Sequence, residues 1–379
     1  MKKIGIGLIG YGGIGKIHTL GYKDIAMYYP GTLPEIDLAA VCTSRPKTAQ
    51  KAAKEGGFRN WYTDHSALIQ SDEVMVVDCS LPNFAHKAVL LEAVAAGKHV
   101  YCEKPLAMNG AEAREIAVAA EKAGVQIGMT FNYRFVPALQ RAHELVRDGA
   151  LGQIYRFQAE YLHTGYESPE RPLSWRLQHD KSGGGALADL GAHVIDLMRW
   201  LLGEFQSVQA LTHTYITERP LAKGSQETGP VTVDDGAWLQ VKLENGGIGT
   251  IEASRFSTGV LDELRFEICG EKGALRFNLM DANYLYWFDT SRKGGAYGGE
   301  QGWIRLDTNQ NYPGASIPPP RAILGWSRTH AENQYTFLKA IAAGNSVQPS
   351  VCDGLRTQCV LDAAYTSAEE GGWVAVEQE

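Results

Sequence analysis

Several features that mark particular classes of protein are missing from this chain of 379 residues. The six cysteines include no C-x-x-C pair, which argues against a zinc site and favours reduced, structural cysteines in a cytoplasmic protein. The net charge is −7 and basic residues do not cluster, which argues against nucleic acid and anionic membrane surfaces. No long apolar run and no signal-peptide pattern occur, so we expect neither a membrane span nor secretion.

The remaining composition is that of an ordinary globular protein. Hydrophobic residues make up 44% of the chain and charged residues 21%. Since 379 residues are too many for one small core, two domains are expected.

The N-terminus carries a glycine-rich turn, G-x-G-x-x-G, at residues 10–15. An apolar, strand-like run (4–9) precedes it and a helical stretch (16–26) follows, which is the context of a dinucleotide-binding turn. Glycine permits the tight turn, the close approach of a pyrophosphate and close packing of the helix on the strand. The predicted cofactor-binding residues here are Gly10, Gly12, Gly13, Ile14 and Gly15.

Strands and helices alternate through the first third of the chain. Strand-like segments at 38–42, 74–79, 99–102 and 125–130 are separated by helical segments at 47–54, 64–70, 83–96 and 110–123. This alternation predicts a Rossmann-type α/β domain, a doubly wound parallel sheet, over residues 1–131. Ligands of such sheets bind beyond the carboxyl ends of the strands.

Three of those strand ends carry chemistry. Thr43-Ser44-Arg45 offers no carboxylate against a 2′-phosphate, so the cofactor is NAD(H) or NADP(H), with both open. The 80–86 segment is either a loop over the cofactor or a plain helix start; its candidate residues are Ser80, Pro82, Asn83 and His86. In Glu103-Lys104-Pro105, Lys104 either stabilises a substrate alkoxide or is a surface lysine paired with Glu103.

The pattern changes near residue 132, where a second domain, 132–379, is expected to begin. Longer, alternating strands predict an α+β domain with a large, mostly antiparallel open-faced sheet, at 154–162, 205–214, 231–243, 248–254, 264–269 and 274–278. Residues 291–320 are expected to form a long loop. Helices at 330–343 and 353–370 end the chain, with packing against the first domain as an alternative placement.

The most informative stretch of this half follows three glycines at 183–185. Asp189 and His193 are four residues apart, so on a helix they share one face, and Asp196 lies close to it. A carboxylate beside an imidazole suits a general base, whereas metal binding would need further ligands, and a helix-capping pair without chemistry is the plain alternative.

The turn at 10–15, the triplet at 103–105 and the Gly183–Gly185, Asp189, His193 pattern occur together and in order. Together they resemble the glucose-fructose oxidoreductase/inositol dehydrogenase/rhizopine catabolism family of NAD(P)-dependent oxidoreductases. The resemblance extends over essentially the whole chain, and residues 132–135 and Trp175-Arg176 fit it too. A departure is Thr43, where NAD-preferring relatives often carry Asp.

The resemblance implies a catalytic lysine at Lys104, an aspartate at Asp189 and a base at His193. It also implies substrate contacts from Lys104, Asn132, Arg134, Tyr161, Trp175, Arg176, Asp189 and His193, while Tyr166, Glu167 and Arg171 belong to the same loops. Glu103 is grouped with the cofactor-binding residues.

The implied activity is oxidation of a ring hydroxyl of a sugar, glycoside or inositol by hydride transfer. Lys104 would stabilise the alkoxide while His193 takes the proton. The family further implies a homodimer or homotetramer formed through the second-domain sheet. No metal is expected, because no further ligands are apparent near Asp189 and His193. Two alternatives remain: a redox-neutral, glycosidase-type enzyme with a bound cofactor, and a sensor that keeps the fold without catalysis.

Overall fold

The computed structural model describes residues 3–310 and 312–378 and divides the chain into two compact units. The first unit contains residues 3–135, 312–319 and 325–355. The second contains residues 136–310, 320–324 and 356–378. Residues 325–355 therefore belong to the N-terminal unit although they lie near the end of the chain.

The first unit is built on a parallel sheet with the strand order β3-β2-β1-β4-β5-β6. Its strands are β1 (Ile4–Ile9), β2 (Ile36–Cys42), β3 (Asn60–Tyr62), β4 (Val76–Cys79), β5 (His99–Cys102) and β6 (Ile127–Met129). This confirms the predicted doubly wound sheet. The chain reverses its direction of progress across the sheet between β1 and β4, which is where ligands bind in this architecture.

Helices alternate with these strands: α1 (Gly13–Tyr28), α2 (Pro46–Gly56), α3 (His65–Ile69), α4 (His86–Ala95) and α5 (Gly110–Ala123). Local sequence sets their ends. Asp64 caps α3 by accepting a hydrogen bond from the Ser66 N–H at 3.0 Å. Asn109 caps α5 in the same way, and α5 ends at Gly124, whose φ of 66° is readily available to glycine.

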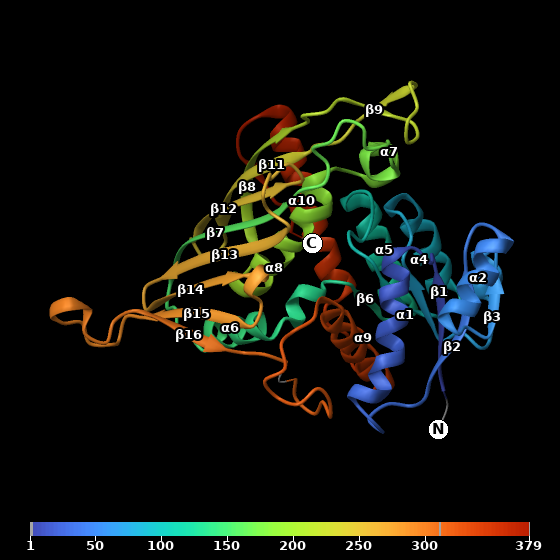
Figure 1. The fold of residues 1–379 in the computed structure, drawn as a ribbon, viewed down its shortest axis with the longest axis horizontal. Coiled ribbons are helices and arrows are strands. Elements are labelled where there is room, and N and C mark those ends of the chain that lie inside the picture. Colours follow the sequence, from blue (N-terminus) through green and yellow to red (C-terminus); the bar gives the residue numbers. More distant parts are fainter. Residues whose placement is uncertain (1–2, 311, 379) are drawn as a thin grey trace. The chain divides into compact units, whose positions relative to one another are not determined.

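The late helix α9 (Trp326–Ala342) packs beside α1 within the first unit (Figure 1). The rings of Tyr29 and Tyr335 stack with centroids 3.6 Å apart. The Tyr29 hydroxyl donates to Glu332 at 2.7 Å. The buried Phe337 lies against Tyr101 of β5, so α9 covers part of the parallel sheet.

The second unit contains a large mixed sheet with the order β16-β15-β14-β13-β7-β12-β11-β8-β17. Strands β7 and β12 run parallel and the other neighbouring pairs run antiparallel, which confirms the largely antiparallel prediction. Its strands are β7 (Ile154–His163), β8 (Phe205–His213), β11 (Gly236–Leu243), β12 (Ile248–Ser254), β13 (Asp262–Gly270), β14 (Gly273–Asn278), β15 (Tyr284–Asp289), β16 (Trp303–Asp307) and β17 (Val374–Ala375).

Helices α6 (Pro137–Arg147) and α8 (Ala192–Leu202) pack on this sheet and against each other (Figure 1). Helix α10 (Val351–Glu370) begins in the first unit and continues in the second. A small hairpin, β9 (Glu218–Pro220) with β10 (Thr228–Pro230), lies in the long connection before β11.

Some predicted boundaries were wrong. Residues 231–235 precede β11 instead of belonging to it, because the buried carboxylate of Asp235 accepts hydrogen bonds from the Tyr215 and Ile216 N–H groups and holds that segment in a loop. Strand β16 lies inside the expected 291–320 loop. Its side chains are partly or largely exposed on both faces, so it carries little apolar alternation for a sequence pattern to detect.

All six cysteines are without a disulfide bond. Within residues 3–310 and 312–378, none of the helices combines the length and the apolarity that crossing a bilayer requires.

Candidate functional site

The glycine-rich turn after β1 has the geometry that its sequence predicts. Gly10 has a φ of 94°, and a Cβ there would meet the Ser80 carbonyl oxygen at 2.5 Å. A Cβ on Gly15 would meet the Gly10 carbonyl oxygen at 2.2 Å. Both positions therefore require glycine for the turn itself.

Gly12 and Gly13 differ from these two glycines because they are exposed, and a Cβ on either would meet nothing within 4 Å. Gly12 stands at the N-terminus of α1, where neither a side-chain cap nor an acidic residue occupies the first turn. The free N–H groups and the helix dipole therefore face an open space that suits an anion. The turn fits the pyrophosphate of a dinucleotide.

The end of β2 holds Thr43 by hydrogen bonds within the protein. Its hydroxyl lies 2.6 Å from the Thr48 hydroxyl, and Thr48 also donates to the Arg45 carbonyl oxygen at 2.8 Å. Ser44 and Arg45 are exposed. The polar side chains accessible at this strand end are thus a hydroxyl and a guanidinium.

The segment after β4 is mostly structural. Ser80 donates to Asp78 at 2.9 Å, Pro82 is partly exposed, and Asn83 is buried at 8% exposure. His86 is fully buried, and each of its ring nitrogens lies 3.0 Å from a backbone carbonyl oxygen, of Pro105 or Leu81. Burial lowers the pKa of His86.

Cys79, His86 and Cys102 lie close enough together to hold a metal ion. Because the nitrogens of His86 already face carbonyl oxygens, this arrangement favours the helix-start interpretation of the segment over a ligand site.

Glu103 and Lys104 follow β5 at the same edge of the sheet. They are the two partly exposed residues in the otherwise buried run from Val100 to Ala107. An accessible lysine in this position can reach a ligand bound beyond the strand ends.

Sequence analysis missed a buried charged cluster behind Lys104, centred on His18 in α1. His18 Nδ1 lies 3.0 Å from both carboxylate oxygens of Asp78, and His18 Nε2 lies 3.1 Å from Glu103 Oε1. Tyr22 donates to Asp78 at 2.7 Å. The rings of Tyr101 and His330 also pack against His18.

The charges of this cluster follow from its contacts. Burial favours a neutral His18, but the carboxylates of Asp78 and Glu103 outweigh it and raise its pKa to about 10. The pKa of Glu103 is lowered, because the contacts with His18 outweigh its burial. Burial lowers the pKa of His330 to about 3, helped by the neighbouring His18 charge. At neutral pH the imidazolium of His18 thus lies between two carboxylates.

In the second unit, Asp189 and His193 are the two accessible residues of a buried segment. Every other residue from Gly184 to Arg199 is buried. Asp189 lies in a π-helical turn (Leu187–Gly191), and His193 lies in the first turn of α8. The α-helix expected around Asp189 was therefore a wrong prediction in type, although both side chains reach the surface of the segment.

The π-helical turn is held by Asp234, which sequence analysis missed. Its carboxylate accepts hydrogen bonds from the N–H of Gly185 at 2.9 Å and from the N–H of Leu187 at 2.8 Å. A Cβ on Gly185 would meet the Asp234 carbonyl oxygen at 1.9 Å, so glycine is required there. Tyr365 of α10 donates to the same carboxylate at 2.8 Å.

Arg255 is a second residue that sequence analysis missed. It follows β12 directly, is 2% exposed, and donates from Nη2 to Asp189 Oδ2 at 2.9 Å. Its guanidinium also lies over the ring of Tyr166, 4.8 Å from the centroid. A buried, charged donor therefore fixes the Asp189 carboxylate.

The end of β7 lies near His193. The ring of Tyr161 packs edge-on against His193 with centroids 5.8 Å apart, and its hydroxyl donates to Asp262 at 2.8 Å. Although burial opposes it, the contacts of Asp262 with His163 and Tyr161 hold its pKa below the usual value. Tyr161 is 4% exposed, so it supports the imidazole more than it presents a surface.

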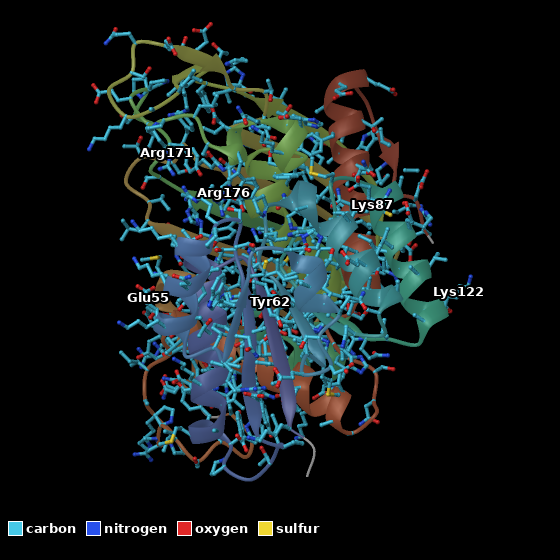
Figure 2. All side chains as sticks on the ribbon, turned by 90° about the vertical axis from the view of Figure 1, so that its right-hand side faces the viewer. Glu55, Tyr62, Lys87, Lys122, Arg171 and Arg176 are labelled. Atoms are coloured by element: carbon cyan, nitrogen blue, oxygen red, sulfur yellow. The ribbon has the colours of Figure 1, made fainter. Side chains whose placement is uncertain are left out.

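The loop after β7 supplies aromatic and cationic side chains. Arg171 lies over the ring of Tyr166 and Arg176 over the ring of Trp175, 3.9 and 4.4 Å from the centroids. Figure 2 labels both arginines, which are exposed. Glu167 is partly exposed and accepts a hydrogen bond from the Gly165 N–H.

Asn132 and Arg134 lie in the interior of the first unit. Asn132 is 2% exposed and donates to Thr329 of α9 at 3.0 Å. Arg134 is 5% exposed and pairs with Asp353 of α10 at 2.8 Å. This placement favours a structural role over a substrate contact.

Comparisons with known proteins follow this division of the chain. Residues 4–131 match a model described as the oxidoreductase family with NAD-binding Rossmann fold, and residues 139–276 match the GFO/IDH/MocA C-terminal domain. The chain is 35% identical to levoglucosan dehydrogenase of Pseudarthrobacter phenanthrenivorans, covering 100% of this chain and 99% of the relative. It is 32% identical to D-glucoside 3-dehydrogenase of Escherichia coli, covering 72% of this chain and 76% of the relative.

Among solved structures, levoglucosan dehydrogenase in complex with NADH and levoglucosan superposes with a TM-score of 0.93 at 35% identity. The match covers 99% of this chain and 100% of the other.

Alanine at Gly12 and alanine at Gly15 are expected to have different effects, on NADH affinity and on stability. Gly12→Ala should leave stability unchanged, because the added Cβ meets open space, yet weaken NADH binding at least about tenfold by filling the anion site. Gly15→Ala should destabilise the protein by about 1–3 kcal/mol through overpacking. NADH fluorescence titration and urea denaturation measure the two effects. Unchanged NADH affinity in Gly12→Ala would contradict the placement of the dinucleotide.

The His18 cluster predicts a dependence of stability on pH. A pKa near 10 in the folded state, above about 6.5 in the unfolded chain, means that protonation of His18 stabilises the fold below pH 6.5. That stabilisation should be lost as pH rises towards 10. Urea denaturation of wild type and His18→Gln at pH 7, 8.5 and 10 should show the steeper loss in wild type. Parallel curves for the two proteins would refute a protonated His18.

Proposed function

Because the chain belongs to the glucose-fructose oxidoreductase/inositol dehydrogenase/rhizopine catabolism family of oxidoreductases, we propose that it oxidises a ring hydroxyl of a pyranose or anhydrosugar to a ketone. The activity of the family is an NAD(P)-dependent oxidation at a CH–OH group. The substrate, the hydroxyl and the residues that act on it are the proposed part.

The observation that carries the proposal is the exposure pattern around Asp189 and His193. A segment that is buried from Gly184 to Arg199 exposes a carboxylate and an imidazole and little else. Buried scaffolds with a few accessible titratable groups are typical of sites in which side chains must be held in one geometry.

The proposed chemistry assigns one role to each accessible residue. His193 takes the proton from the substrate hydroxyl, and the ammonium of Lys104 stabilises the negative charge that develops on that oxygen. Asp189, fixed by Arg255, orients the imidazole or a neighbouring substrate hydroxyl. The dinucleotide, held at its pyrophosphate by the Gly12 turn and the N-terminus of α1, supplies the hydride acceptor.

The substrate class rests on the relatives and on the loop after β7. The names of the two relatives concern an anhydrosugar and a glucoside. Trp175 and Tyr166 are partly exposed aromatic side chains that suit the apolar face of a sugar ring, and the arginines beside them suit its hydroxyls.

NAD is the proposed cofactor, because the similar levoglucosan dehydrogenase has been solved with NADH. The exposed Arg45 is the residue that would favour a 2′-phosphate, so NADP is compared in the same assays.

The test is oxidation of levoglucosan, methyl glucosides, glucose 6-phosphate and myo-inositol with NAD or NADP, followed by absorbance at about 340 nm. Lys104→Met and His193→Asn should each lower kcat at least about a hundredfold. Lys87→Met and His65→Asn are matched controls, since both residues form surface ion pairs, Lys87 with Glu115 and His65 with Glu92. Near wild-type rates in both site variants would refute the assignment.

We also propose that the second-domain sheet makes subunit contacts in a homodimer or homotetramer. The sheet carries two adjoining shallow pockets, one lined by Leu211 and Trp238 and the other by Ile248 and Trp373. Leu211 and Ile248 are 62% and 58% exposed. Such exposed apolar side chains mark an interaction surface.

Light scattering after gel filtration tests this interface. Wild type should exceed the monomer mass of 41.4 kDa at least twofold, whereas Leu211→Glu/Ile248→Glu should approach it. Leu261→Glu, at an equally exposed loop leucine, serves as the control. A wild type that elutes as a monomer would end the proposal.

A further inference from the structure

A row of buried charged side chains in the first unit connects α1, which follows the glycine-rich turn, to the end of β5, which precedes Lys104. It runs from Asp78 at the end of β4, through His18 on α1, to Glu103 after β5. His18 and Asp78 are both 0% exposed, and the Glu103 side chain is 12% exposed. The next residue in the chain is Lys104.

The geometry selects one protonation state for His18. Nδ1 has hydrogen-bond geometry towards the Asp78 carboxylate, and Nε2 lies 3.1 Å from Glu103 Oε1, an ion-pair distance without hydrogen-bond alignment. An ionised carboxylate accepts hydrogen bonds without donating any. A neutral imidazole carries one N–H and would leave its bare nitrogen facing a negative charge. The imidazolium places a positive charge beside both carboxylates, in agreement with the raised pKa of His18.

The other groups around His18 do not compete for this charge. Tyr22 and Ser80 both donate to Asp78, at 2.7 and 2.9 Å, and the Ser80 hydroxyl, which carries no charge, also lies 3.2 Å from His18 Nδ1. Tyr101 packs its ring edge-on against the imidazole. His330 is held neutral at physiological pH by burial, which lowers its pKa to about 3. His18 is therefore the cation that balances Asp78 and Glu103 inside the unit.

The charge of Glu103 matters because it lies next to Lys104. A carboxylate with no other cation would attract the neighbouring ammonium, raise its pKa and turn it away from a substrate oxygen. With His18 paired to Glu103 at 3.1 Å, the lysine does not have to neutralise that carboxylate.

We propose that His18 is a positioning residue for Lys104, holding the Glu103–Lys104 segment through Glu103 and neutralising the carboxylate beside the lysine. This inference rests on the proposed role of Lys104 in catalysis. It also gives α1 two roles. The N-terminus of the helix faces the proposed pyrophosphate site, and His18, three residues after Gly15, pairs with Glu103 beside Lys104.

A double-mutant cycle of His18→Gln, Glu103→Gln and the double variant tests the inference. The assay uses NAD with levoglucosan, or with whichever sugar has the highest turnover in the assay above. His18→Gln should lower kcat roughly ten- to a hundredfold, the usual loss for a supporting partner, with NADH affinity within threefold of wild type. The double variant should recover most of the loss, because the uncompensated carboxylate is gone.

The pH dependence of kcat/KM distinguishes the proposed role from a packing role, because a loss of packing alone would not shift it. In His18→Gln the alkaline limb of kcat/KM should shift to higher pH, because Glu103 then raises the pKa of Lys104, and it should return in the double variant. His99→Gln is the matched control. It removes another histidine from the opposite end of β5, where its Nδ1 accepts from the Gln126 N–H.

The outcomes separate this inference from the proposed function. If Lys104→Met is inactive while His18→Gln keeps wild-type kcat, this inference is wrong and the proposed function stands. If Lys104→Met is active, both are wrong. If the losses of kcat in the two single variants add in the double variant, His18 acts only through packing and the inference is wrong.

If His18→Gln does not fold, a measurement on the wild-type protein still tests the inference. In protein with ¹⁵N-labelled histidine, the His18 ring should keep the signature of an imidazolium through pH 8, assigned by its loss in His18→Asn or by its contacts with Tyr22 and Tyr101. Glu103→Gln alone should then lower the His18 pKa. A neutral His18 at pH 7 would overturn the inference.

Discussion

Parallel pairing is the constraint on which the rest of the structure depends. Because β1, β2, β4 and β5 run in one direction, the residues that follow them collect at one edge of the sheet: the glycine turn, Thr43, Ser80 and Lys104. The second sheet repeats the device on a smaller scale. Its parallel pair, β7 and β12, brings the ends of both strands to one edge, and these ends are followed by the aromatic loop and Arg255.

Each unit then surrounds its accessible groups with buried polar partners. Asp234 accepts from the backbone of the π-helical turn, Arg255 fixes Asp189, and His18 pairs with Glu103. These partners are themselves largely inaccessible, so they act on the residues that reach the solvent and not on a ligand. Desolvated charges are costly unless paired, and the pairing also fixes the direction in which the accessible groups point.

The fold could be predicted from the sequence, and so could the accessible residues of the candidate site, whose roles stay predictions; the buried partners of those residues could not. The Gly10–Gly15 turn and the spacing of Asp189 and His193 are local patterns. No local pattern marks His18, Asp234 and Arg255, because their partners Asp78, Gly185 and Asp189 lie 60, 49 and 66 positions away along the chain. The π-helical turn was missed for the same reason, since its cap comes from the loop before β11 and not from its own sequence.

The membership of α9 in the first unit has a consequence for synthesis of the protein on the ribosome. When residue 135 has emerged, the parallel strands are complete, but Phe337, Tyr335 and Leu338, which cover part of that sheet, have not yet been made. The nascent N-terminal unit therefore exposes apolar surface, including Tyr101 and Tyr29, for the whole time that the second unit is translated. That surface is not buried until residues 335–338, near the end of the chain, have been made.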